Sequence, residues 1–132
     1  MSVFVDTSAL LAIMDADDAS HRRAAAAWKK LLTTDETLLT SSYVVVEVFA
    51  LVQRRLGMDA VRALESDVIP TLKVVWIDAE IHRRAVAALL AASRKKLSLV
   101  DCSSFEVMRE YGIRKALTLD RNFSAQRFNV VP

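Results

Sequence analysis

Four acidic side chains could do chemistry in this chain, because each one ends an apolar run or interrupts it. A carboxylate is costly to bury without a partner, and two of them ~4 Å apart repel by about 4 kcal/mol at an effective dielectric constant of ~20. A divalent cation bound between them would remove that repulsion. The four are Asp6 after Val3-Phe4-Val5, Glu47 within residues 44–49, Asp101 within residues 97–102, and Asp120 after Thr118-Leu119.

The donor type indicates which metal would bind. All four candidate ligands are carboxylates, which favour Mg²⁺ or Mn²⁺ over the Zn²⁺ and Cu²⁺ that prefer nitrogen and sulfur donors. Mg²⁺ keeps several waters in such a site and commonly serves phosphate chemistry, where it polarises phosphoryl oxygens and activates a water. The pattern therefore predicts hydrolysis of a phosphodiester bond.

Each acid also has a purely structural alternative, since Asp and Glu are common at helix starts and in turns. Four such coincidences are together less probable than one shared site. The alternatives are a helix N-cap for Asp6, an ion pair with Arg54 or Arg55 for Glu47, a first-turn acid for Asp101, and a turn residue for Asp120.

The segments around these acids alternate between strands and helices. Strands are expected at residues 3–5, 38–40, 73–77, 116–119 and 129–131, and helices at residues 9–14, 21–32, 43–56, 58–68, 79–96 and 98–111. Such alternation is typical of an α/β fold in which a mostly parallel sheet lies between helices. Ligands of these folds bind beyond the carboxyl ends of the strands, where Asp6 and Asp120 are placed.

One of these segments is ambiguous. Residues 44–48 contain four valines, which favour a strand, but the run to Leu56 is longer than an ordinary strand and Gly57 stops it as a residue after a helix would. We therefore predict a helix there. The cations at 94–96 are expected in the last turn of their helix, where they would complement its dipole.

Composition limits the class of protein. More than half of the 132 residues are apolar and only two are glycine and two proline, so a single domain spanning residues 1–132 is expected. One cysteine, Cys102, excludes an internal disulfide and a cysteine-built zinc site, which suits the cytoplasm. The charge at Asp6 arrives too early for a signal peptide, and no apolar run is long enough to cross a bilayer.

These motifs together resemble the PIN domain, particularly the VapC-type toxins of bacteria and archaea. The resemblance rests on residues 3–10, the helix with Glu47, residues 97–102 and residues 116–123, so it covers nearly the whole chain. It implies a three-layer α/β/α sandwich, Mg²⁺- or Mn²⁺-dependent endoribonuclease activity, a homodimer, and inhibition by a VapB-type antitoxin. Asp6, Glu47, Asp101 and Asp120 match the family's acidic positions.

Two further positions follow from this resemblance. Thr7 stands where relatives often carry a hydroxyl that supports the metal or its waters, although a capping role is an equal alternative. Asn122 stands where many relatives carry another acid, and a neutral amide is a weaker ligand, which argues against a second tightly held metal.

RNA would be held mainly through its phosphates, and the small net charge of +2 means that only local clusters of cations could do this. The alternative for each cation is an ordinary solvated helix face. The candidates are Arg22, Arg23, Arg54, Arg55, Arg94, Lys95 and Lys96.

Three rival functions remain open. A haloacid-dehalogenase-type phosphatase would need a second aspartate two residues after Asp6, where this chain has Ser8. A receiver domain would need a phosphoacceptor after a middle strand, and only Asp78, a helix cap, is available. A binding module that kept the fold and lost turnover is a third reading, which the presence of all four acids disfavours.

Overall fold

Five short strands form one sheet in the computed structural model, which describes residues 1–132. They are β1 (Ser2–Val5), β2 (Thr37–Ser41), β3 (Lys73–Val75), β4 (Lys115–Leu117) and β5 (Asn129–Val131). The order across the sheet is β3-β2-β1-β4-β5, and every neighbouring pair is parallel. The predicted sheet is confirmed, and the first strand is its centre.

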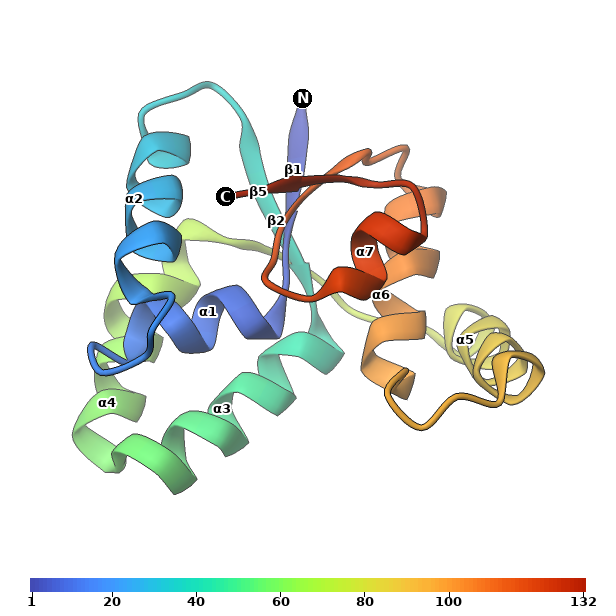
Figure 1. Ribbon diagram of the computed structural model, residues 1–132, viewed down its shortest axis with the longest axis horizontal. Coiled ribbons are helices and arrows are strands. Elements are labelled where there is room, and N and C mark those ends of the chain that lie inside the picture. Colours follow the sequence, from blue (N-terminus) through green and yellow to red (C-terminus); the bar gives the residue numbers. More distant parts are fainter.

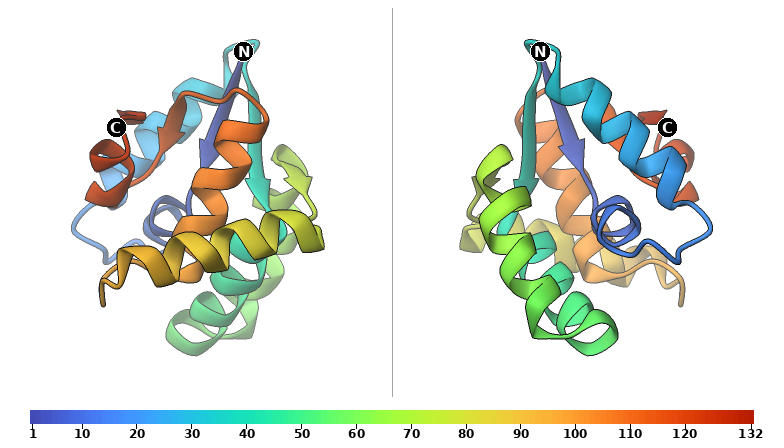
Figure 2. Two further views of the ribbon diagram at one scale, coloured as in Figure 1. Left: turned by 90° about the vertical axis from the view of Figure 1, so that its right-hand side faces the viewer. Right: turned by 90° about the vertical axis from the view of Figure 1, so that its left-hand side faces the viewer.

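Helices cover both faces of this sheet and complete the predicted three layers. They are α1 (Thr7–Met14), α2 (His21–Leu32), α3 (Ser42–Leu56), α4 (Met58–Ala63), α5 (Ala79–Ala92), α6 (Leu99–Glu110) and α7 (Arg121–Ala125). The first, second and fourth lie on one side, and α5 and α6 lie on the other (Figures 1 and 2). Helix α3 runs below the carboxyl ends of the strands and packs against both α1 and α6.

The valine-rich segment is helix α3, as predicted. Val44, Val48 and Val52 are fully buried at a spacing of four residues, which places them on one helix face. The side chain of Ser41, the last residue of β2, accepts a hydrogen bond from the Val44 amide at 3.2 Å and caps the helix. Helix packing and a cap thus outweigh the strand preference of valine.

Three predicted ends are wrong: those of the third and fourth strands, the latter ending at Leu117 and not at residue 119, and that of the helix expected at residues 79–96. Strand β3 ends at Val75, because the Ile77 amide already donates to the Ser42 hydroxyl, 3.0 Å away, in place of a strand neighbour. Helix α5 ends at Ala92, where Ser93 takes a left-handed conformation with φ of 53°. The cations Arg94, Lys95 and Lys96 therefore lie in the loop before α6 and not in the last turn of α5.

Helix α7 was not predicted from the sequence, because five residues are too few to show a helical period. It is held by one aromatic side chain, Phe123, which is fully buried. The Phe123 ring lies 4.9 Å from that of Phe105 on α6 and 6.3 Å from that of Phe4 on β1, measured between ring centres. This anchor fixes the residues at the start of α7 relative to the centre of the sheet.

The segment after α4 stays helical through residue 68, as predicted, but as a π-helical turn, η1 (Leu64–Val68), followed by a 3₁₀ turn, η2 (Ile69–Thr71). Pro70 lies in the latter turn and ends the helical run. No helix combines the length and the apolar character needed to cross a bilayer.

Gly57 gives a test of this fold. Its φ of 91° and ψ of −178° fall in a region that residues other than glycine almost never occupy. We expect Gly57→Ala to lower the free energy of unfolding by about 1–3 kcal/mol in urea denaturation. No atom lies within 4 Å of the added methyl group, so the loss would come from the backbone alone.

Gly112→Ala is the matched control. It also has open space, but its φ of 65° lies where other residues are sometimes found, so its loss should be smaller. Equal losses in the two variants would contradict this explanation.

Candidate functional site

Asp6 and Asp120 lie side by side at the carboxyl end of the sheet because β1 and β4 are parallel neighbours. The Asp6 amide donates to the Leu117 carbonyl at 3.0 Å, which continues the pairing of the two strands past their ends. Asp101 approaches the same edge from the first turn of α6. Asp101 and Asp120 follow Asp6 by 95 and 114 positions in the sequence, and the fold brings all three to one end of the molecule.

The Asp6 carboxylate is buried and fixed through one oxygen only. Its Oδ2 accepts hydrogen bonds from the Ser8 hydroxyl at 2.8 Å, the Thr118 hydroxyl at 3.0 Å and the Ser8 amide at 3.4 Å. Its Oδ1 makes no hydrogen bond. The N-cap alternative for Asp6 is thus correct, but it uses only half of the carboxylate.

Thr118 links Asp6 to Asp120. While it donates to Asp6, its Oγ1 accepts from the Asp120 amide at 2.9 Å. Ser8 adds a second link, because its hydroxyl accepts from the Leu119 amide at 2.9 Å. Sequence analysis did not assign a role to either hydroxyl, although their place beside the strand-end aspartates was a usable signal.

Asp101 and Asp120 resemble Asp6 in that only one oxygen of each carboxylate is hydrogen-bonded to the protein. Oδ2 of Asp101 accepts from the Ser98 amide at 3.0 Å, which closes a capping box at the start of α6. Oδ1 of Asp120 accepts from the Asn122 amide at 2.9 Å and caps α7. The remaining oxygens have no protein partner and are not sealed from solvent, so all three aspartates can still take an external ligand.

Two of the three aspartates have raised pKa values. Burial raises the pKa of Asp6 above its usual value, although hydrogen bonds from Ser8 and Thr118 oppose the rise. Burial raises the pKa of Asp101 to about 6, and the negative charges of Asp120 and Asp6 contribute to it. A cation at this edge would relieve both effects.

Glu47 is not drawn into this network. It is half-buried on α3 and makes no hydrogen bond or ion pair, so the alternative of pairing with Arg54 or Arg55 is wrong. The carboxylates that raise the pKa of Asp101 are those of Asp120 and Asp6. Glu47 belongs to α3, which packs against the helices that follow Asp6 and contain Asp101, and it forms no hydrogen bond with the three aspartates.

Thr7 and Asn122 differ in what they offer. The Thr7 hydroxyl is buried beside Asp6 with no hydrogen-bond partner, so the capping alternative for Thr7 is wrong. The Asn122 amide is occupied, because its Oδ1 accepts from Arg94 at 3.5 Å and its Nδ2 donates to the Lys96 carbonyl at 3.2 Å. Asn122 thus ties the 93–98 loop to α7.

The donors at this edge fit a hard cation. No three His, Cys, Asp or Glu side chains are close enough to form a ready-made metal cage. Mg²⁺ does not require one, since it typically uses one or two carboxylates and fills its remaining positions with water. Three free carboxylate oxygens and the orphaned Thr7 hydroxyl, itself costly to leave unsatisfied, are oxygen donors of the required kind.

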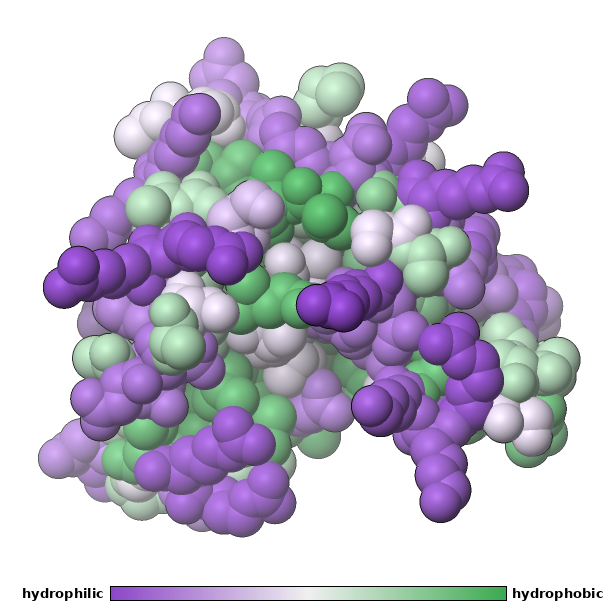
Figure 3. Space-filling view, in the orientation of Figure 1, coloured by the Kyte–Doolittle hydropathy of each residue, from purple (hydrophilic) through white to green (hydrophobic).

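The candidate RNA-binding cations are all exposed, and they occupy three places. Arg22 and Arg23 stand at the start of α2, Arg54 and Arg55 at the end of α3, and Arg94, Lys95 and Lys96 in the α5–α6 loop. Of these, only Arg23 lines a pocket next to Asp120, and a further cation in that pocket, Arg121, was missed by sequence analysis. Long hydrophilic side chains project at the left and the right of the molecular face that Figure 3 shows.

Comparison with known proteins gives a family match over almost the whole chain. A family model described as the PIN domain matches residues 3–129. The chain is 34% identical over 127 residues to the 23S rRNA-specific endonuclease VapC20 of Mycobacterium tuberculosis, covering 96% of this chain and 95% of that protein. It is 30% identical to Ribonuclease VapC26 of the same organism, covering 98% and 100% respectively.

Solved structures agree with this match. The crystal structure of M. tuberculosis VapC20, described as a sarcin–ricin loop cleaving toxin, superposes with a TM-score of 0.87 at 33% identity, covering 98% of this chain and 99% of that one. FitAcB from Neisseria gonorrhoeae superposes with a TM-score of 0.69 at 18% identity, covering 100% and 97%, which supports the fold alone.

The crowding of carboxylates predicts how stability depends on pH without metal. A carboxyl group whose pKa is raised on folding binds its proton more tightly in the folded state. Its stabilising contribution is therefore complete below the usual value of 3.8 and is lost as pH rises through about 6. In EDTA, we expect the free energy of unfolding to fall across this window by up to ~1.4 kcal/mol per pH unit from Asp101.

Asp101→Asn is the control, because an amide oxygen can still accept from the Ser98 amide but does not titrate. Urea denaturation between pH 4 and 7 should give a flatter profile for this variant than for the wild-type protein. Parallel profiles would show that the Asp101 carboxylate is not crowded in solution.

Proposed function

This chain belongs to the PIN domain family, and on that basis we propose that it is a Mg²⁺- or Mn²⁺-dependent endoribonuclease, the toxin of a VapBC-type pair. One observation about three aspartates of this chain supports the proposal. Asp6, Asp101 and Asp120 each commit one carboxylate oxygen to the protein and keep the other free at the same edge of the sheet.

The proposed roles follow from these contacts. Asp6, held by Ser8 and Thr118, binds the metal through Oδ1, and Thr7 hydrogen-bonds a water or phosphate oxygen beside it. A bound Mg²⁺ or Mn²⁺ would polarise the phosphoryl oxygens and lower the pKa of a water. Asp101 or Asp120 orients the attacking water through the oxygen that does not cap a helix.

Glu47 has a separate role in this proposal. It forms no hydrogen bond with the aspartates and does not contribute to the raised pKa of Asp101, so it would bind the metal through an intervening water. Asn122 is a weaker ligand than a carboxylate, because its amide is neutral and both of its ends are hydrogen-bonded to the 93–98 loop. We therefore propose one tightly held metal in the absence of substrate.

The substrate, partner and setting are proposed from the relatives. The name of VapC20 indicates that it cuts 23S rRNA, and its structure is described as cleaving the sarcin–ricin loop, so a hairpin of that sequence is the first substrate to test. Other neighbours are toxin–antitoxin complexes, which favours a VapB-type antitoxin as partner. We propose a homodimer acting in the cytoplasm, where ribosomes are found.

Removal of the metal or of Asp6 tests the enzymatic proposal. With a sarcin–ricin hairpin and Mg²⁺ or Mn²⁺, we expect specific cleavage that stops in EDTA and falls at least about 100-fold in Asp6→Asn. Asp17→Asn is the matched control, since Asp17 is exposed and its carboxylate makes no contact. Glu47→Gln should reduce cleavage less than Asp6→Asn does.

Thermal melts must first show that each variant folds. Cleavage that persists in EDTA, or in folded Asp6→Asn, would overturn the metal-dependent mechanism. A wild-type protein that binds Mn²⁺ by calorimetry but cuts no RNA would instead support the silent binding module.

The partner proposal has its own test. Co-expression with the small gene adjacent to the one encoding this chain should yield a stable complex that no longer cuts the hairpin. Light scattering during gel filtration should give twice the 14.7 kDa chain mass for the protein without its partner. A monomer that remains active would remove the dimer from the proposal and leave the nuclease.

A further inference from the structure

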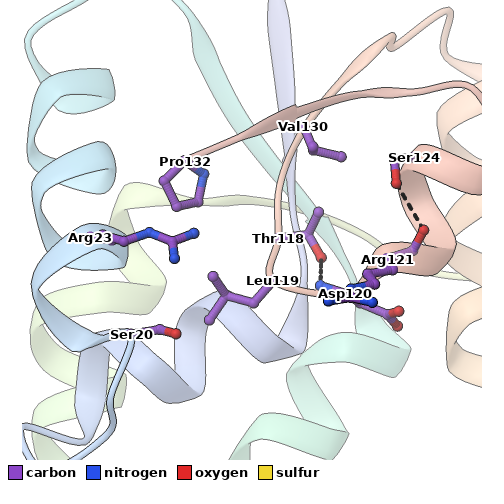
Figure 4. A pocket seen from close by; sticks show the side chains of 9 residues that line it. All are labelled: Ser20, Arg23, Thr118, Leu119, Asp120, Arg121, Ser124, Val130 and Pro132. Atoms are coloured by element: carbon purple, nitrogen blue, oxygen red, sulfur yellow. Dashed lines mark hydrogen bonds between the residues drawn. The ribbon is translucent and has the colours of Figure 1, made fainter.

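A pocket of 280 Å³ opens beside the aspartates, between the start of α2, the end of β4, and α7 (Figure 4). Its lining includes Asp120, one of the three aspartates, and Thr118, whose hydroxyl donates to Asp6. We propose that this pocket binds the RNA nucleotide next to the scissile phosphate, with Arg23 and Arg121 holding its phosphate group. This inference rests on the proposed nuclease function.

The two arginines reach the pocket from different elements. Arg23 extends from α2 toward Leu119, and Arg121 stands at the first position of α7 (Figure 4). Both are exposed, and neither guanidinium makes an ion pair or hydrogen bond within the protein. Because a guanidinium presents parallel N–H donors that match phosphate oxygens, two of them around one pocket suit a phosphate ligand.

The remaining walls suit the sugar and base of a nucleotide. Leu119 and Val130 form an apolar part, and Val130 is among the few large apolar side chains of the chain that are exposed, at 40%. The Ser20 hydroxyl makes no hydrogen bond, and that of Ser124 donates to the Arg121 carbonyl at 3.0 Å and can still accept. The volume is just below the ~300–1,000 Å³ of small-molecule sites, which fits one nucleotide and no longer segment.

The position of the pocket also suits a continuous strand. If the scissile phosphate lies at the aspartates, the chain must leave them in two directions. The pocket lies between α2 and α7. The α5–α6 loop, whose residues include Arg94 and Lys96, is tied to α7 through Asn122, and it lies beyond α7 as seen from α2 (Figure 1). The phosphates on both sides of the scissile bond would then lie near basic side chains, and the scissile phosphate would lie at the aspartates.

Phe123 anchors the turn that carries Asp120 and Arg121. It is fully buried against β1 and α6, two residues after Arg121, so the backbones of Asp120 and Arg121 are held on one anchored turn. A nucleotide bound by Arg121 would therefore lie within one side-chain length of the turn that carries Asp120.

The test measures RNA binding separately from cleavage. A fluorescein-labelled sarcin–ricin hairpin is titrated with protein in EDTA at several NaCl concentrations, using Arg23→Gln, Arg121→Gln and the double variant. Each lost phosphate contact should reduce the slope of log affinity against log salt by about 0.7–0.9. We expect affinity to fall about tenfold for each arginine, since a hydrogen bond to a charged group is lost.

Arg127→Gln is the matched control. It removes the same charge from the exposed segment after α7 but lines none of the pockets, so its salt slope should equal that of the wild-type protein. With Mg²⁺, the pocket variants should raise KM about tenfold and change kcat less than threefold, because the contact lies outside the reacting group.

The outcomes separate the two proposals. If the wild-type protein cuts the hairpin and the pocket variants match Arg127→Gln in slope and affinity, the pocket inference is wrong and the nuclease stands. If the slopes fall as expected but nothing is cut, the subsite stands and the catalytic proposal fails. A wild-type protein that neither binds nor cuts the hairpin would overturn both.

Discussion

The chemistry of this protein depends on negative charges that the fold places close together at one end of a parallel sheet. Because β1 and β4 are neighbours, the aspartates that follow them must lie together, and α6 adds a third from its first turn. Burial raises the pKa of Asp6, and burial together with the charges of Asp120 and Asp6 raises the pKa of Asp101, so the fold keeps these groups in an unfavourable state that a divalent cation would relieve. Affinity for metal and instability without it have the same origin.

Structural and chemical roles are divided between the two oxygens of each aspartate. One oxygen caps a helix: α1 for Asp6, α6 for Asp101 and α7 for Asp120. These caps hold each carboxylate in one orientation, and the other oxygen stays free for a ligand. The alternatives raised from the sequence, an N-cap for Asp6 and a first-turn acid for Asp101, were therefore correct as descriptions, and they do not compete with metal binding. Positioning by backbone amides is rigid, which a catalytic site requires.

Beside this acidic edge, the short helix α7 places several side chains that could contact a substrate. Helix α7 has only five residues, yet it presents Asp120 to the aspartates, Arg121 to the neighbouring pocket and Asn122 to the α5–α6 loop. One buried ring, Phe123, holds all three in place. The basic side chains on both sides favour a polyanion, whereas the chain's net charge of +2 alone would not.

The sequence by itself determined the alternation of strands and helices, the sheet layers and the strand-end position of Asp6 and Asp120, because hydrophobic periods and caps are local signals. It also indicated the PIN domain family, which the comparisons confirm. Only the tertiary structure decided that Arg23 and Arg121 line one pocket, that the Glu47 carboxylate forms no hydrogen bond or ion pair, and that the Asn122 amide is hydrogen-bonded to the α5–α6 loop. Those relations depend on strand order and on the packing of Phe123, which join residues about a hundred positions apart and leave no periodic trace in the sequence.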